Sequence, residues 1–409
     1  MAQEVALNSG NTAWMLTASA LVVFMTIPGL ALFYGGLDRA KNILNTIAMV
    51  IVAFAITAIT WYIVGYSIAY GNDIAGFIGN PLDYLLGRGL NGLTDNGYPV
   101  SVDIMFQLTF AAITTAIIAG SLVGRMKFSA WILFTILWSI FVYPVIAHWV
   151  WGGGFLSSHG ELDFAGGTVV HINAGIAGLV AAMLLGARKE KLLLPNNVPL
   201  VVLGAGILFF GWFGFNAGSA LAADQIAGWA MLNTTLATAA AALTWMVLEY
   251  IHFGKPTIVG LASGIVAGLV AITPAAGFVN PTGAILVGIL GTIPAFYAVI
   301  WLKKKFGYDD ALDAWGIHGI AGIAGALLTG IFADPAINGG TGLLYGNFKQ
   351  LLIQVEGVLA TLIYSGVMTA IIMIIVKALT GGAKVSQEEE IEGLNKSQHG
   401  ERAYNEIAS

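Results

Sequence analysis

The sequence predicts an all-α integral membrane protein with eleven transmembrane helices. Of its 409 residues, 57% are hydrophobic and only 10% are charged, whereas soluble domains carry about 25% charged residues. Helices are expected because backbone polar groups cannot be left unpaired in lipid. Apolar runs of spanning length, roughly 20 residues, lie near 12–35, 44–70, 102–123, 129–150, 166–187, 198–217, 227–251, 257–275, 281–302, 316–333 and 351–379.

The basic residues orient these eleven runs. They gather after the odd-numbered runs, as in Arg39, Lys41, Arg125, Lys127 and Lys303 to Lys305, while the opposite loops contain only Arg88 and Lys349. The positive-inside rule therefore predicts a multi-pass protein of the cell (plasma or inner) membrane, with its N-terminus outside and its C-terminus in the cytoplasm. We expect residues 1–379 to form the transmembrane domain and residues 380–409 a cytoplasmic tail.

Two segments of the chain are near copies of each other. Residues 171–178 read HINAGIAG and residues 318–325 read HGIAGIAG, and Asp163 and Asp310 each lie eight residues before the histidine of their segment. The first segment belongs to the fifth predicted helix, which runs inward, and the second to the tenth, which runs outward. This pattern predicts an inverted five-helix repeat, helices 1–5 and 6–10, followed by a long eleventh helix. Transporters commonly place their site at such a repeat interface.

His171 and His318 are the leading candidates for a functional site. An ionisable side chain inside a membrane span is costly and is a functional candidate by default. The small residues after each histidine favour close approach of the two helices. The alternative is two unrelated buried histidines bonded to helix backbone. The other histidines, His148, His159, His252 and His399, show no such pairing and are interpreted as interfacial or loop residues.

Four motifs carry a resemblance to a known family. They are DFAGGTVVHINA at 163–174, WGGG at 151–154, GWFGFNAGS at 211–219 and DAWGIHG at 313–319. Together they resemble the ammonium transporter family, in its Amt/methylammonium permease branch of bacterial or archaeal type, which is related to the Rhesus proteins. The resemblance covers all eleven predicted helices and extends into the tail at 393–404.

The resemblance implies an outer recruitment site formed by Trp151, Phe110 and Ser219, and a gate formed by Phe110 and Phe215. Aromatic faces attract a cation, and a serine hydroxyl accepts an N–H hydrogen bond. Without the resemblance, aromatic residues near a membrane boundary are more often belt residues, and a phenylalanine in a helix is more often packing.

The resemblance also implies that His171 and His318 hydrogen-bond to each other and line a pore beside Trp212. An imidazole pair can accept or pass on a proton, whereas a bare cation in an apolar channel suffers heavy desolvation. The pair therefore suits a small amine that sheds and regains a proton.

Two aspartates are expected to support this site. Asp163 precedes Gly-Gly-Thr at the start of the fifth helix, where a carboxylate caps exposed N–H groups, and its charge would also favour cation entry. Its counterpart near His318 is Asp310 by the offset of eight, or Asp313 by the family motif.

The chain is therefore expected to be an ammonium transporter and not an enzyme. Ammonium, and also methylammonium, would be recruited outside and deprotonated, and ammonia would pass the two histidines, with or without coupled proton transfer. The resemblance implies a homotrimer and a cytoplasmic partner of the PII class bound through the tail. An ammonium sensor with little transport and a Rhesus-type neutral gas channel are the alternatives. No cofactor, metal or nucleic acid is expected.

Overall fold

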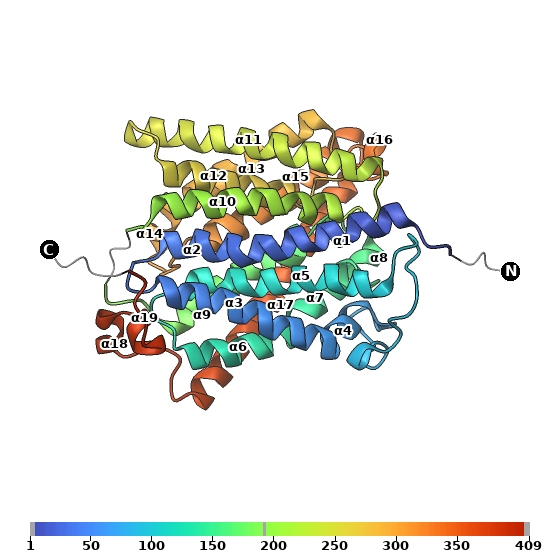
Figure 1. Ribbon diagram of the computed structural model, residues 1–409. Helices are drawn as coiled ribbons and strands as arrows, with labels where there is room; N and C mark the ends of the chain where they lie inside the picture. Colours follow the sequence, from blue (N-terminus) through green and yellow to red (C-terminus); the bar gives the residue numbers. More distant parts are fainter. Residues whose placement is uncertain (1–4, 191–193, 405–409) are drawn as a thin grey trace.

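The protein is an all-helical bundle whose helices run roughly parallel to one another (Figure 1). The computed structural model describes residues 5–190 and 194–404. Within these residues, ten helical segments are long and apolar enough to cross a membrane. They are Ser9–Leu37, Ile43–Tyr70, Val100–Leu122, Phe128–His159, Gly167–Leu185, Val198–Ala217, Gln225–Phe253, Pro281–Phe306, Trp315–Phe332 and Phe348–Leu379.

The predicted span at 257–275 forms a shorter helix than expected. It folds as α12 (Ile258–Ile272), which has 15 residues, or about 22 Å of helix. Thr273 is the C-cap and Pro274 follows it, and proline lacks the N–H that would continue the helical ladder, so the helix ends there. Nevertheless α12 packs against α10 (Val198–Trp212), α11 (Gln225–Phe253), α13 (Pro281–Tyr297) and α15 (Ala321–Phe332) inside the bundle.

Several of the long segments contain breaks. The first consists of α1 (Ser9–Phe24), a π-helical turn η1 (Met25–Leu30) that contains Pro28, and α2 (Ala31–Leu37). The fourth consists of α6 (Phe128–Phe141), α7 (Tyr143–Val150) and α8 (Phe155–His159), and Pro144 opens α7. Proline lacks the N–H that continues a helical ladder, which explains both breaks.

The remaining helices keep the expected order. The second segment is α3 (Ile43–Thr60), η2 (Trp61–Gly65) and α4 (Tyr66–Tyr70), and the third is α5 (Val100–Leu122). The fifth is η4 (Gly167–Ile172) and α9 (Asn173–Leu185), and η5 (Phe213–Ala217) follows α10. Near the C-terminus lie η6 (Ala298–Leu302), α14 (Lys303–Phe306), η7 (Trp315–Ile320), α16 (Pro335–Asn338) and α17 (Phe348–Leu379).

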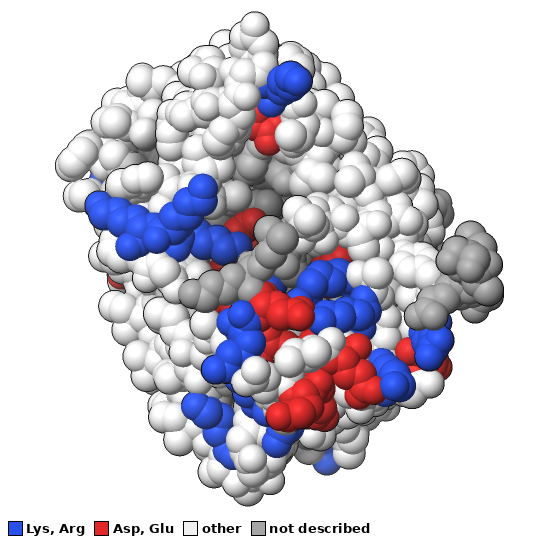
Figure 2. Space-filling view, turned by 90° about the vertical axis from the view of Figure 1, so that its left-hand side faces the viewer, with Lys and Arg blue, Asp and Glu red and all other residues white. Residues whose placement is uncertain are grey.

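The two ends of the bundle differ in structure. One, here called the hairpin end, carries the start of α1 and the 71–99 loop, with the short antiparallel strands β1 (Asp73–Ile74) and β2 (Ile78–Gly79). The other, here called the basic end, carries α14 and the tail helices α18 (Gln387–Glu392) and α19 (Leu394–His399) (Figure 1). Lysine, arginine and acidic side chains gather on its face (Figure 2).

The tail packs against the loop between α2 and α3 of its own chain. Leu394 is fully buried, and the Asn395 side chain donates to the carbonyl of Ala40 at 2.9 Å and accepts from the N–H of Leu44 at 2.8 Å. The predicted tail therefore holds ordered helices up to residue 399, while its last residues, 405–409, lie outside the described part.

Candidate functional site

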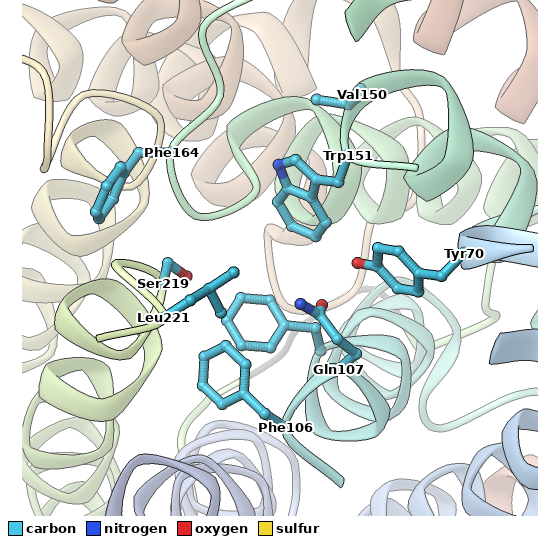
Figure 3. A pocket seen from close by; sticks show the side chains of 9 residues that line it. Tyr70, Phe106, Gln107, Val150, Trp151, Phe164, Ser219 and Leu221 are labelled. Carbon is cyan, nitrogen blue, oxygen red and sulfur yellow. The ribbon is translucent and has the colours of Figure 1, made fainter. Parts of the chain in front are cut away.

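A cavity of about 300 Å³ opens at the hairpin end (Figure 3). Trp151, Phe110 and Ser219, the three residues expected at a recruitment site, all line it. Trp151 is held by its indole N–H, which donates to the carbonyl of Asp163 at 2.9 Å, and its ring meets Phe110 edge-on, with ring centroids 6.0 Å apart. The other lining residues are Tyr70, Phe106, Gln107, Val150, Phe164 and Leu221.

Phe110 and Phe215, the two residues of the expected gate, are stacked beneath the cavity. Their ring centroids are 4.1 Å apart with an interplanar angle of 20°, and both side chains are buried. The hydroxyl of Ser219 donates to the carbonyl of Phe215 at 2.8 Å, which leaves oxygen lone pairs available for an incoming N–H donor. The stacked rings thus separate the cavity from the interior.

His171 and His318 lie directly below these rings and contact each other. Their Nδ1 atoms are 3.1 Å apart, their rings are near-parallel at 22°, and both are buried. Phe215 and Trp212 both pack on His171, with centroids 5.9 and 5.3 Å away. Trp212 donates its indole N–H to Thr273 Oγ1 at 2.9 Å. A continuous file of rings therefore runs from Trp151 to His318.

The contact between two Nδ1 atoms constrains the protons of the pair. A hydrogen bond needs one donor and one acceptor, so only one of the two Nδ1 atoms carries the shared proton. When both rings are neutral, the other ring must carry its proton on Nε2. His171 Nε2 is itself buried and without a hydrogen-bond partner among the described residues. An imidazole pair of this kind is chemically able to accept or pass on a proton.

Glycines bring the two histidine-bearing helices together. A Cβ on Gly175 would lie 2.5 Å from the backbone of Gly319, and one on Gly322 would lie 3.2 Å from His171 Cβ. Each helix thus presents a glycine to the start of the other, so that η4 with α9 crosses η7 with α15 in a reciprocal way. The small residues after each histidine allow this approach, as sequence reasoning expected.

Asp163 lies beneath the start of η4, where it accepts backbone hydrogen bonds. Its two carboxylate oxygens accept from the N–H groups of residues 166, 167, 168 and 169, at 2.5 to 3.2 Å. Burial raises the pKa of Asp163, and these four N–H groups act in the opposite direction. The side chain therefore caps the helix that carries His171.

Asp310, and not Asp313, is the structural counterpart of Asp163. Asp310 is buried and accepts from the N–H groups of Ala314 and Trp315 at 3.1 and 2.8 Å, at the start of η7. Asp313 instead has a left-handed backbone with φ 60° and pairs with Lys303 at 2.8 Å. The capping contacts therefore belong to Asp310, whereas the Asp313 carboxylate bonds to Lys303.

His148 is also placed differently from the sequence interpretation. It is fully buried within the helix α7 and is therefore not a loop residue. Its Nδ1 lies 2.9 Å from the carbonyl of Ala69, and its Nε2 lies 2.8 Å from a carboxylate oxygen of Asp73 in β1. His148 thus ties the β1–β2 hairpin to α7, whose C-cap is Trp151.

Sequence reasoning missed the polar side of the hairpin-end cavity. Gln107 lines the cavity and is 8% exposed, and Figure 3 shows its amide and the Tyr70 hydroxyl pointing into the space beside Trp151. One turn earlier in α5, buried Asp103 accepts from the hydroxyls of Tyr66 and Tyr98 at 2.7 and 2.8 Å. Polar residues within a predicted apolar run were the available signal.

Comparison with known proteins assigns this arrangement to a family. The model of the Ammonium Transporter Family matches residues 13–404. The chain belongs to the ammonium transporter family. An ammonium transporter of Aquifex aeolicus is 67% identical over 405 residues, covering 99% of this chain and 95% of that protein. The ammonium transporter Amt1 of Archaeoglobus fulgidus is 45% identical over 402 residues, covering 97% and 100%.

Solved structures of similar proteins share the fold of this family member. Mep2 of Saccharomyces cerevisiae superposes with a TM-score of 0.87 at 36% identity, covering 93% of this chain and 88% of that one. A protein described as a sensor Amt protein superposes with a TM-score of 0.89 at 30% identity, covering 95% and 98%. The resemblance inferred from four short motifs is thus confirmed over nearly the whole chain.

Proposed function

We propose that this member of the ammonium transporter family recruits ammonium at Trp151, Phe110 and Ser219, removes its proton near the Phe110 and Phe215 rings, and passes ammonia along His171 and His318. The observation that carries the proposal is the unbroken file of rings from the cavity to the histidine pair. Its outer members offer faces to a cation, and its inner members offer nitrogen atoms that bind and release protons.

The order of events follows from desolvation. A cation in an apolar interior loses the hydration that stabilises it, whereas neutral ammonia loses far less. The stacked phenylalanines are the point where the polar lining ends, so the proton is most readily lost there. The histidine pair then provides a relay by which the proton can follow, which would make transport electrogenic. Without that relay, transport would be electrically neutral.

The proposal also covers the number of membrane spans, the repeat, the orientation in the membrane and the assembly of the protein. We propose eleven spans, with α12 as the short eighth, and an inverted repeat that relates helices 1–5 to helices 6–10. The reciprocal glycine contacts and the equivalent caps of Asp163 and Asp310 support the repeat. We further propose that the basic end faces the cytoplasm, that the chain forms a homotrimer, and that the tail contacts a partner of the PII class.

A role as an ammonium sensor is the second candidate. The structural similarity to a protein described as a sensor Amt protein favours it. A sensor would share the recruitment cavity and differ in the rate of passage, so binding and flux must be measured separately.

The deciding experiment is an ammonium concentration jump on proteoliposomes, recorded as current. A sustained, saturable current supports transport with proton transfer. Flux of ammonia without current supports a neutral conduit, and binding without flux supports the sensor.

Substitution of the histidines tests the relay. His171→Ala and His318→Ala, each alone, should lower the current at least tenfold or lose the exclusion of potassium, because the shared proton has no partner. His252→Ala is the matched control, since His252 is exposed at the end of α11. Current and potassium exclusion that survive both substitutions would refute the relay.

A further inference from the structure

A second cavity, at the basic end, is lined by charged side chains. It has a volume of about 410 Å³. Its lining includes Arg188, Lys303, Lys304, Asp309 and Asp313. Asp313 lies just before η7, and His318 follows five residues later, which is about 7.5 Å along a helix axis. The cavity therefore borders the basic-end start of the helix that carries His318.

The two carboxylates in this lining are already paired. Lys303 Nζ donates to Asp313 Oδ1 at 2.8 Å, and Arg188 Nε donates to both carboxylate oxygens of Asp309 at 3.0 Å. Three cationic side chains line the cavity against two carboxylates. In the described part of the chain, Lys304 forms no ion pair to offset this excess.

The nearby Asp310 does not add a free acceptor. Its oxygens accept from Ser121 Oγ at 2.7 Å and from the backbone N–H groups at the start of η7. An ammonium ion arriving at the basic end thus meets positive charge and carboxylates that are occupied by other cations or donors.

The hairpin-end cavity has the opposite character. Aromatic rings, Gln107 and Ser219 line it, and its described lining contains no lysine or arginine. A cation is attracted to the faces of such rings, while like charges repel one another. The two cavities therefore present different surroundings to an arriving cation, whereas neutral ammonia carries no net charge for the lysines to repel.

We propose that Lys303 makes the two mouths unequal in their affinity for ammonium. By occupying Asp313 and placing its own charge in the cavity, Lys303 lowers the affinity of the basic-end mouth for ammonium, so that entry from that end needs a higher ammonium concentration. Ammonia is not repelled and can leave at the basic end. The inference rests on the proposed function, in which this cavity is one mouth of the pathway.

The test measures ammonium-driven current from each side of proteoliposomes that contain the full chain in a known orientation. Lys303→Met should lower the ammonium concentration that gives half-maximal current from the basic end roughly fivefold at low salt, the factor expected for one unit charge at contact distance in water. The half-maximal concentration from the hairpin end should stay within about twofold of wild type. High salt should shrink the effect, because it screens exposed charges.

A second variant, Asp313→Asn, should change the half-maximal concentration for current driven from the basic end in the opposite direction. Asp313→Asn removes the partner and leaves the charge of Lys303 free, so this concentration should rise above that of wild type. Asparagine tolerates the left-handed backbone of this position. Lys303→Arg should keep the wild-type asymmetry. Lys305→Met is the matched surface control, because Lys305 lies 4.4 Å from the centroid of the Trp301 ring.

The outcomes separate this inference from the proposed function. Equal changes from both sides, or no change, for Lys303→Met would overturn the proposed role of Lys303. A loss in both directions for Lys303→Arg as well would assign Lys303 a structural role and would also overturn it. A wild-type protein without ammonium current or flux from either side would overturn the proposed function itself.

Discussion

The helix that carries His171 and the helix that carries His318 can be compared directly. Each follows a buried aspartate that accepts backbone N–H groups, places its histidine in a π-helical turn, and continues with glycines that meet the other helix. The surroundings differ, since the hairpin-end cavity is aromatic and the basic-end cavity is charged. The shared features hold the two imidazoles in contact, and the differences distinguish the two ends of the bundle.

The largest expected effect is a difference in stability between variants that lack the Asp163 cap and variants that lack the Asp310 cap. Asp163→Ala removes the acceptor of four buried N–H groups, while Asp310→Ala removes the acceptor of two. Each orphaned buried donor costs about 1–3 kcal/mol, so Asp163→Ala should lower the free energy of unfolding by more than about 4 kcal/mol. Denaturation in mixed micelles measures both.

The Asp163 cap also has a conservative control variant. Asp163→Asn keeps one carbonyl oxygen and should recover part of the loss. If Asp163→Ala and Asp310→Ala lowered the free energy of unfolding equally, the number of N–H groups that each carboxylate accepts would not determine its contribution to stability.

A smaller difference in stability is expected between alanine substitutions at Gly175 and at Gly322, the two glycines at the contact of the histidine-bearing helices. Alanine at Gly175 places its Cβ 2.5 Å from backbone atoms of Gly319, which cannot move aside as a side chain can, whereas alanine at Gly322 meets Ile172 Cγ1 at 3.1 Å. Overpacking costs about 1–3 kcal/mol, and Gly175→Ala should lie at the upper end of that range. Thermal unfolding together with ammonium flux gives the comparison, and a larger loss at Gly322→Ala would reverse the assignment.

A pH-dependent effect concerns Glu161, an acid two residues before Asp163; the corresponding residue before Asp310 is Tyr308. Glu161 accepts from Thr168 Oγ1 at 2.6 Å. Burial raises the pKa of Glu161 to about 8, with nearby Asp163 adding to the shift. Because the folded pKa exceeds that of the unfolded chain, stability is greatest below about pH 4.5 and falls as pH rises towards 8, by roughly 1 kcal/mol per pH unit.

Glu161→Gln should flatten this pH dependence, as unfolding midpoints between pH 5 and pH 8 would reveal. Glu392→Gln is the control, because Glu392 is exposed at the end of α18 and is not one of the groups that shift the Glu161 pKa. A slope that survives in Glu161→Gln belongs to another group.

Much of this fold is predictable because the bilayer imposes length and polarity on each span. Ten of the eleven predicted runs form long apolar helices, and the exception, α12, is shortened by Pro274. The contact of His171 with His318 is likewise foreseeable from the duplicated segments, since equivalent positions in two crossing helices approach each other.

The rest depends on contacts that no local pattern encodes. The offset of eight identified Asp310 as the cap, yet the motif favoured Asp313, whose carboxylate turns to Lys303 through a left-handed backbone. His148 looked unpaired because its partners, Ala69 and Asp73, are more than seventy residues away in the chain. A role for the Gln107 amide could be recognised only once the structure placed it in the lining of the hairpin-end cavity.

The stacking of Phe110 on Phe215 has a consequence for rate under the proposed function. Two buried rings whose centroids are 4.1 Å apart leave no room for a molecule between them, so a molecule that follows the proposed path must wait for at least one ring to move to another rotamer. Buried rings swing more slowly than exposed side chains, which move in picoseconds to nanoseconds. Throughput should therefore saturate at a ceiling set by ring motion, well below the conductance of an open water-filled channel.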